Sequence, residues 1–140
     1  MTYLWIAIGS ALGGVLRYAM TRATLGFDHG FPFGTVVINV LGSFTIGYFG
    51  TLTLHGGRLE VSDNVRLFVM VGICGGFTTF SSFSLQTFDL LRTGAWGRAL
   101  VNVVGSVVLC VGAVAVGHMV AHHVVARDEV AQNSTEEYTG

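Results

Sequence analysis

The sequence predicts an all-α integral membrane protein with four transmembrane helices, the third of them broken near the middle of the membrane. Hydrophobic residues make up 51% of the 140 residues, whereas charged residues make up 11%, against about 25% in a typical globular protein. The mean hydropathy is +0.65, so there is too little charge to cover a water-exposed surface. The formal net charge of −1 also argues against nucleic-acid binding, which needs clustered basic residues.

Four stretches are long and apolar enough to cross a bilayer, which takes about 20 predominantly apolar residues. They lie at residues 4–20, 33–54, 67–91 and 99–121, and short segments rich in polar and turn-forming residues connect them. After residue 126 the composition becomes acidic and loses its apolar periodicity. We therefore expect a four-helix transmembrane domain over residues 1–126 and a disordered acidic tail over residues 127–140.

Glycine is frequent, with 20 residues in the chain, and small residues recur at i and i+4. The pairs are Gly9 with Gly13, Ser43 with Gly47, and Gly72 with Gly76. In lipid, such pairs allow helix backbones to approach closely. Tight helix packing is therefore the expected role of these residues.

Two of the spans carry a polar stripe. In the second span the stripe consists of Thr35, Asn39, Ser43 and Gly47, and in the fourth of Asn102, Ser106 and Cys110. Residues four apart share one helix face, and an amide at membrane depth needs a partner or water. Hydrogen bonding between helices would explain one such stripe, whereas two together favour a shared polar path.

The third span contains the segment Gly72-Ile73-Cys74-Gly75-Gly76-Phe77-Thr78-Thr79-Phe80-Ser81-Ser82-Phe83-Ser84. Each glycine inside a helix costs roughly 1 kcal/mol relative to alanine, and the residues that follow are mediocre helix formers. We therefore predict a break near the middle of the membrane, where freed backbone groups must be buried or line a cavity or ion site. The spacing of Phe77, Phe80 and Phe83 brings at least two rings together, and ring edges can face an anion.

The arginines show no bias that would orient the chain. With four spans, one side of the membrane receives Arg58, Arg66 and Arg127, and the other receives Arg17, Arg22, Arg92 and Arg98. Basic loops normally stay on the cytoplasmic side. A count of three arginines on one side and four on the other predicts insertion in both orientations. Two oppositely inserted copies could then pair as an antiparallel dual-topology dimer.

The sequence resembles the Fluc/CrcB family of fluoride channels. The motifs that carry the resemblance are Gly13-Gly14-Val15-Leu16-Arg17-Tyr18, Phe33-Gly34-Thr35, Asn39-Val40-Leu41-Gly42-Ser43-Phe44 and the string from Gly75 to Ser84, together with Ser106. The resemblance spans roughly residues 3–121. It implies a passive, fluoride-selective channel of the cell membrane, and not an enzyme, that exports cytoplasmic fluoride through two pores in an antiparallel homodimer.

The resemblance also implies roles for individual residues. Phe80 and Phe83 would turn their ring edges to fluoride, Asn39 and Ser106 would line the pore, and Thr79 and Ser82 would add hydroxyl donors. Arg17 would lie near the vestibule. The backbone carbonyls of Gly75 and Thr78 would hold a structural sodium ion at the dimer centre. The partner would be a second copy of the chain or a paired homologue, since some relatives form heterodimers.

Two positions depart from the family pattern. Gln86 stands where many members have glutamate shortly after the phenylalanine motif, so a charge-dependent role there is in doubt. Asn102 stands where many have tyrosine, so the pore wall would differ in shape.

Two other classes of membrane protein are alternatives. A small proton-coupled multidrug exporter would need a carboxylate inside the membrane, and Asp89 is the only acid within a span and lies near its end. A non-transporting assembly subunit would leave the two polar stripes unexplained.

Near the end of the fourth span, His118 and His122 share a helix face beside His123. Their spacing could suit a metal. Since no third ligand is apparent, we expect them to lie at the membrane interface.

Overall fold

The computed structural model describes residues 1–27, 30–54 and 59–139, with side chains only as far as residue 126. All of its regular structure is helical. The elements in order are α1 (Thr2–Thr24), η1 (Leu25–Phe27), α2 (Phe33–Leu52), α3 (Asp63–Leu67), the π-helix η2 (Phe68–Cys74), α4 (Gly75–Phe77), α5 (Phe80–Arg92) and α6 (Trp96–Thr139).

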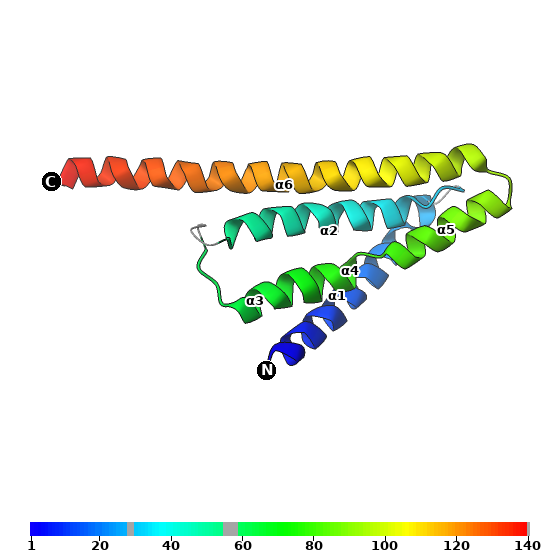
Figure 1. Ribbon diagram of the computed structural model, residues 1–140, viewed down its shortest axis with the longest axis horizontal. Coiled ribbons are helices and arrows are strands. Elements are labelled where there is room, and N and C mark those ends of the chain that lie inside the picture. Colours follow the sequence, from blue (N-terminus) through cyan, green and yellow to red (C-terminus); the bar gives the residue numbers. More distant parts are fainter. Residues whose placement is uncertain (28–29, 55–58, 140) are drawn as a thin grey trace.

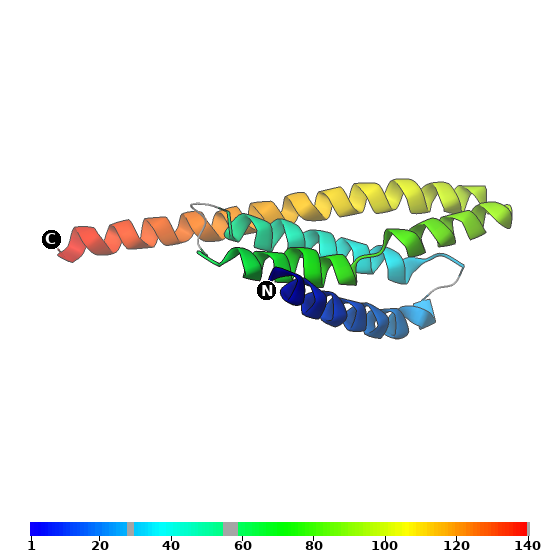
Figure 2. The same cartoon turned by 60° about the horizontal axis from the view of Figure 1, so that its bottom comes forward.

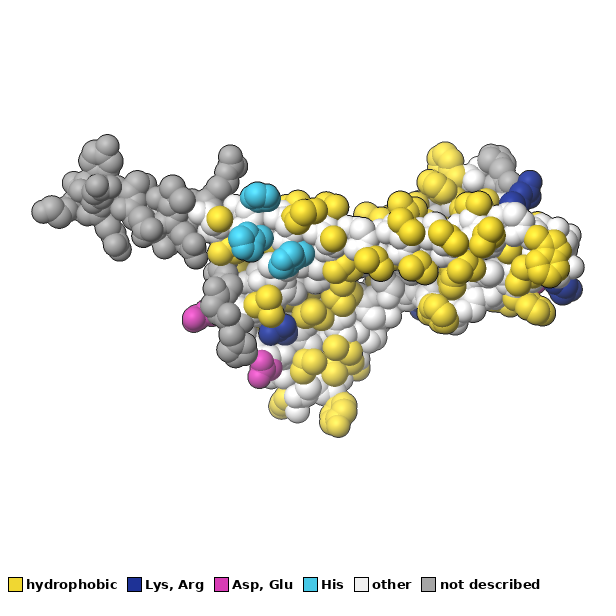
Figure 3. Space-filling view, turned by 45° about the horizontal axis from the view of Figure 1, so that its top comes forward, with side chains coloured by type: hydrophobic (Ala, Val, Ile, Leu, Met, Phe, Trp, Pro, Cys, Tyr) yellow, Lys and Arg dark blue, Asp and Glu magenta, His cyan; other side chains and the backbone are white. Residues whose placement is uncertain are grey.

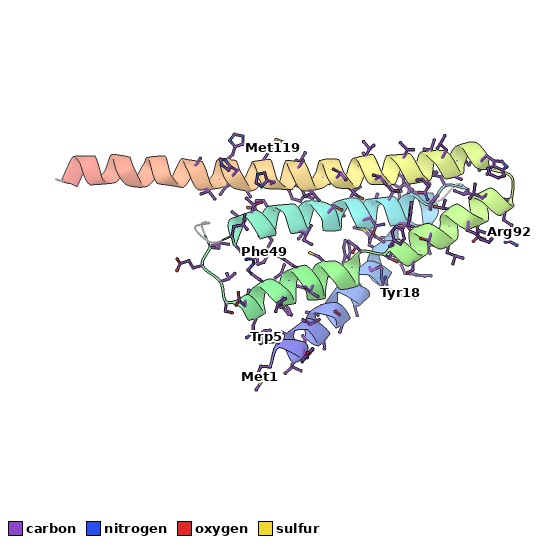
Figure 4. All side chains as sticks on the ribbon, in the orientation of Figure 1. Met1, Trp5, Tyr18, Phe49, Arg92 and Met119 are labelled. Carbon is purple, nitrogen blue, oxygen red and sulfur yellow. The ribbon has the colours of Figure 1, made fainter. Side chains whose placement is uncertain are left out.

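Four helical segments are long and apolar enough to cross a membrane, and they confirm the predicted spans. They are Thr2–Phe27, Phe33–Leu52, Asp63–Arg92 and Trp96–Ala126. The chain runs back and forth, so that the N-terminus, the end of α2 and the far end of α6 lie toward one end of the molecule (Figure 1). The second view shows α1 on the opposite side of the bundle from α6 (Figure 2). Figure 4 shows Trp5 near the start of α1 and Arg92 at the end of α5, well apart in the bundle.

The outer surface of the bundle is apolar, as contact with lipid requires. Large hydrophobic side chains along α6 are more than half exposed in the single chain, among them Val101, Val108 and Val111. Figure 3 shows hydrophobic side chains along the length of this helix. The most deeply buried large side chains are Ile38 and Asn102, each at 1% exposure. A polar side chain is therefore buried as deeply as the centre of the apolar core.

Glycines hold α1 against the third span, as their spacing predicts. A β-carbon on Gly9 would lie 2.9 Å from the Cα of Gly72, and one on Gly72 would lie 2.8 Å from the Cα of Gly9. Gly13 meets the backbone of Ile73 and Phe77 in the same way. The atoms that an added β-carbon would meet belong to the backbone, so no flexible side chain could move aside to make room for it.

Gly76→Ala is expected to destabilise the protein by about 1–3 kcal/mol, the usual effect of overpacking. Its β-carbon would lie 2.5 Å from the carbonyl oxygen of Ser10 and 2.9 Å from the Ser10 Cα. The matched control is Gly112→Ala on α6, where no atom lies within 4 Å and alanine should stabilise the helix by up to about 1 kcal/mol. Thermal unfolding in detergent measures both. Equal melting temperatures for the two variants would contradict the packing of α1.

Helices α2 and α6 run side by side in the same direction with a constant register. A β-carbon on Gly47 would lie 3.0 Å from the Cα of Val114, and the Thr51 hydroxyl lies 2.9 Å from Nδ1 of His118. Both pairs are 67 residues apart in the sequence. This register determines which residues of the two polar stripes face each other.

The third span is broken at Thr78 and Thr79, between α4 and α5, which confirms the predicted break. Both residues are extended, with φ −75° and ψ 159° at Thr78 and φ −151° and ψ 109° at Thr79. The predicted cause needs correction, because Gly75 and Gly76 stay helical. Gly76 serves close packing instead, and a cap at Thr79 starts the new helix.

At its other end, α6 extends beyond the bundle (Figure 1). Its helical backbone continues to Thr139 and so includes the acidic segment. The division into a transmembrane domain and a disordered tail stays a prediction. Arg58 and the side chain of Arg127, which enter the arginine count, lie outside the described residues.

Candidate functional site

A pocket of about 370 Å³ opens between α2, the broken third span and α6. It gathers most of the predicted site residues, namely Asn39, Gly75, Thr78, Thr79, Phe80, Phe83 and Ser106. Ser43 and Cys110 of the two polar stripes also line it. Residues up to 71 positions apart in the chain thus meet around one cavity.

Asn39 holds the broken segment by pairing with the backbone of Thr79. The Thr79 amide donates to Asn39 Oδ1 at 2.8 Å, and Asn39 Nδ2 donates to the Thr79 carbonyl at 3.2 Å. The side-chain amide therefore replaces the backbone partners that Thr79 would have within a continuous helix. An unpaired buried backbone group would cost about 1–3 kcal/mol, so this pair stabilises the break.

The break also frees two backbone carbonyls on the pocket wall. In a continuous helix the Gly75 carbonyl would accept from the amide of Thr79, which instead donates to Asn39. The Thr78 carbonyl would accept from the amide of Ser82, which instead donates to the Thr79 hydroxyl at 3.2 Å. Carbonyl oxygens released in this way can coordinate a cation.

The Thr79 hydroxyl forms the N-terminal cap of α5 and joins two serines. It donates to Ser82 Oγ at 3.0 Å and lies 3.2 Å from Ser81 Oγ. Since its single proton goes to Ser82, the Ser81 hydroxyl is the donor to Thr79. Thr79 has no proton left, whereas the Ser82 proton is free for another acceptor. Ser82 does not line the main pocket.

Two phenylalanine rings flank the start of α5. The ring centroids of Phe80 and Phe83 lie 5.4 Å apart with the planes tilted by 43°. Phe80 is 79% exposed in the single chain, and Phe83 is partly buried. The predicted pairing of two rings is confirmed. Phe77 lies on the other side of the break, beside Gly42.

The polar stripes of α2 and α6 face each other. Asn39 and Ser43 of α2 line the same pocket as Ser106 and Cys110 of α6, and a register of 67 residues, extended from Thr51 and His118, matches Asn39 to Ser106 and Ser43 to Cys110. Periodicity alone predicts each stripe but not this match, which depends on how the helices pack.

In the described part of the chain, three buried side-chain atoms have no hydrogen-bond partner, and one of them belongs to Ser106 at the pocket. Within the described residues they are Ser106 Oγ, Asn102 Oδ1 and Gln86 Oε1. Asn102 donates through Nδ2 to Thr87 Oγ1 at 2.8 Å. Thr87 was missed by the sequence analysis, although its hydroxyl fixes the orientation of Asn102. Because unpaired buried polar atoms are costly, they suggest a role other than stability.

Arg17 and Asp89 lie away from the main pocket. Arg17 belongs to α1 and is half-buried. Asp89 pairs with Arg92 at 3.3 Å, and both side chains are at least half exposed. With Gln86 and Arg98, Asp89 lines a separate hollow of about 380 Å³.

Comparison with known proteins gives consistent matches. Residues 4–118 match the family described as CrcB-like protein, camphor resistance (CrcB). A protein of Gluconobacter oxydans named fluoride-specific ion channel FluC is 56% identical, over 97% of this chain and 96% of its own. A protein of the same name from Methylobacterium radiotolerans is 62% identical over 87% of this chain and 85% of its own.

Proposed function

Because the chain belongs to the CrcB family, we propose that it is a fluoride-specific passive channel that releases cytoplasmic fluoride across the cell membrane. The similarity to named fluoride channels over nearly the whole chain carries this proposal. The four spans make it a multi-pass membrane protein. The pocket between α2, α5 and α6 is the proposed fluoride path.

Conduction follows from the replacement of lost water. Fluoride is small and strongly hydrated, so a narrow path must offer donors where water is removed. Asn39 Nδ2 carries two hydrogens and uses one on the Thr79 carbonyl, which leaves one for the ion. The unpartnered Ser106 hydroxyl and the positive ring edges of Phe80 and Phe83 supply further contacts.

The remaining predicted residues have supporting roles in this proposal. The Thr79 hydroxyl caps α5 and donates its proton to Ser82. Of these two hydroxyls, Ser82 is therefore the one that can donate to the ion. Ser82 would act beyond the pocket, where its proton is free. Arg17, at some distance from the pocket on α1, would attract anions at the vestibule.

A sodium ion fits the two freed carbonyls of Gly75 and Thr78. Both belong to residues that line the pocket, and both have lost the amide that a continuous helix would give them. Sodium would supply a fixed positive charge that holds the broken segments of two subunits together. Gly75 is exposed in the single chain and has no atom within 4 Å of its β-position, which leaves room for a second subunit.

The proposed assembly is an antiparallel dimer with two fluoride paths. Phe80 is 79% exposed in one chain, and an aromatic ring that serves a pore needs a second wall. The balanced arginines favour insertion in both orientations. A second copy of the chain, or a paired homologue, would close the pocket.

A reporter fused to the C-terminus should be found on both sides of the membrane in comparable amounts. The physical reason is the unbiased arginine distribution. Phosphatase and fluorescent-protein fusions, which are active on opposite sides, measure the two populations. A reporter detected on one side only would contradict dual topology.

Ser106→Ala should lower fluoride efflux without lowering stability. The Ser106 side chain is 7% exposed and its Oγ has no partner, so removing the hydroxyl leaves no other group unpaired. Efflux and melting temperature are measured on the same preparation. Reduced stability with unchanged efflux would show that the hydroxyl serves the fold.

Efflux from liposomes that contain only this protein tests the function itself. Fluoride release without chloride release supports the channel. Movement of a cationic drug driven by a proton gradient would support the exporter. The exporter needs a carboxylate inside the membrane, and Asp89 does not suit that role because it pairs with Arg92 near the end of its helix. If the liposomes showed neither fluoride release nor drug movement, the result would support an assembly subunit.

A further inference from the structure

Three histidines form a cluster outside the proposed fluoride path. His118, His122 and His123 lie on α6, and all three are exposed. Figure 3 shows imidazole side chains gathered on the outside of this part of the helix. Their spacing alone does not distinguish a metal site from an interfacial cluster, but a hydrogen bond from α2 does.

Thr51 determines which nitrogen of His118 is free. The Thr51 hydroxyl donates its single proton to the Gly47 carbonyl at 2.7 Å, and the same oxygen lies 2.9 Å from His118 Nδ1. Since that proton is used, the hydroxyl accepts and Nδ1–H donates. In the neutral imidazole the other nitrogen, Nε2, then keeps its lone pair. A histidine that binds a metal through one ring nitrogen usually donates a hydrogen bond from the other, and this bond orients the ring. For His118 the acceptor is the Thr51 hydroxyl.

His122 places a second imidazole one helical turn from His118, on the same face of α6. The ring centroids of His118 and His122 lie 6.3 Å apart, with the planes tilted by 48°. A metal–nitrogen bond of about 2.0–2.1 Å puts a ring centre roughly 3.2 Å from the ion, so two rings that bind one ion at an angle of about 90–110° have centres about 4.5–5.2 Å apart. The observed separation is about 1 Å longer, a difference that rotation of the two exposed side chains can close. His123 is one residue further along and points about 100° away around the helix.

We propose that His118 and His122 form a two-histidine site for a divalent transition-metal ion, with Thr51 as the positioning residue. Imidazole nitrogen suits Cu²⁺, Zn²⁺ and Ni²⁺, and Cu²⁺ binds most tightly of the three. Within the described residues no group of three or more His, Cys, Asp or Glu side chains could hold a metal. Water would therefore complete the coordination on the exposed side.

Copper titration of the full-length protein in detergent, purified without a polyhistidine tag, tests the site. Electron paramagnetic resonance should show one Cu²⁺ bound by two nitrogens. His118→Ala and His122→Ala should each weaken binding more than Thr51→Val, which should weaken it about tenfold, as removal of a ligand's hydrogen-bond partner usually does. The matched control, His123→Ala, should bind copper as the unchanged protein does.

Equal copper affinity in all four variants, or a spectrum with one nitrogen, would overturn the site. Normal binding by Thr51→Val would overturn its positioning role. His29 and His55 contribute the same background to every variant. Since the exposed histidines carry little packing, gel filtration should show an unchanged assembly, and a repeat with Ni²⁺ guards against a copper-specific artefact. The readout is independent of fluoride efflux, so the two proposals succeed or fail separately.

Discussion

Replacing Phe83 or Phe80 by isoleucine is expected to reduce fluoride efflux by about tenfold or more, which corresponds to ~1.4 kcal/mol on the transport barrier. Isoleucine keeps an apolar side chain but lacks the positive ring edge that can face an anion. Both phenylalanines line the pocket. Initial rates of efflux from liposomes, at equal protein content, measure the effect.

The matched control is Phe88→Ile. Phe88 also lies on α5 and is 60% exposed, but it does not line the pocket. It should conduct normally. Gel filtration should show the same assembly for all three variants, since isoleucine keeps an apolar side chain at each position. Normal efflux in both Phe80→Ile and Phe83→Ile would contradict the aromatic path.

Asn39→Leu is expected to abolish efflux and to lower the free energy of unfolding by about 2 kcal/mol or more. Leucine is similar in size but can neither accept from the Thr79 amide nor donate to its carbonyl. Two backbone groups would lose their partner, at about 1–3 kcal/mol each. The extended residues would then be free to rearrange, and the Phe80 and Phe83 rings would move with them. Melting temperature and efflux measure the two effects.

Thr45→Val on the same helix is the control for Asn39→Leu. The Thr45 side chain is exposed and bonds only to the Leu41 carbonyl within α2. Its replacement should leave both stability and efflux near their original values. If Asn39→Leu matched this control in melting temperature, Asn39 would not stabilise the break.

Local patterns predicted much of the fold. Hydropathy located four spans, and the third span is broken close to the predicted point. The cause was misassigned, because glycine propensity does not distinguish a helix breaker from a packing residue. Gly76 is required by the backbone of Ser10, a contact between residues 66 positions apart that no local pattern contains.

The sequence analysis named most of the residues that meet at the pocket, but it did not predict their hydrogen bonds. Periodicity places Asn39 and Ser106 on polar stripes, yet the register that pairs them depends on packing between α2 and α6. Its position on the stripe predicts a hydrogen-bond partner or water for Asn39, and the family resemblance implies a place in the pore wall, but neither identifies the partner. In the structure Asn39 first holds Thr79, because a broken backbone in an apolar setting needs partners. Thr87 was missed because its role depends on Asn102 of the next helix.

A structure of the assembled protein in sodium fluoride tests the central claim most directly. The account predicts two oppositely oriented subunits whose broken third spans cross near Thr78, with an anion at the ring edges of Phe80 and Phe83. Subunits in the same orientation, with these rings directed into lipid and no anion beside Asn39, would contradict it.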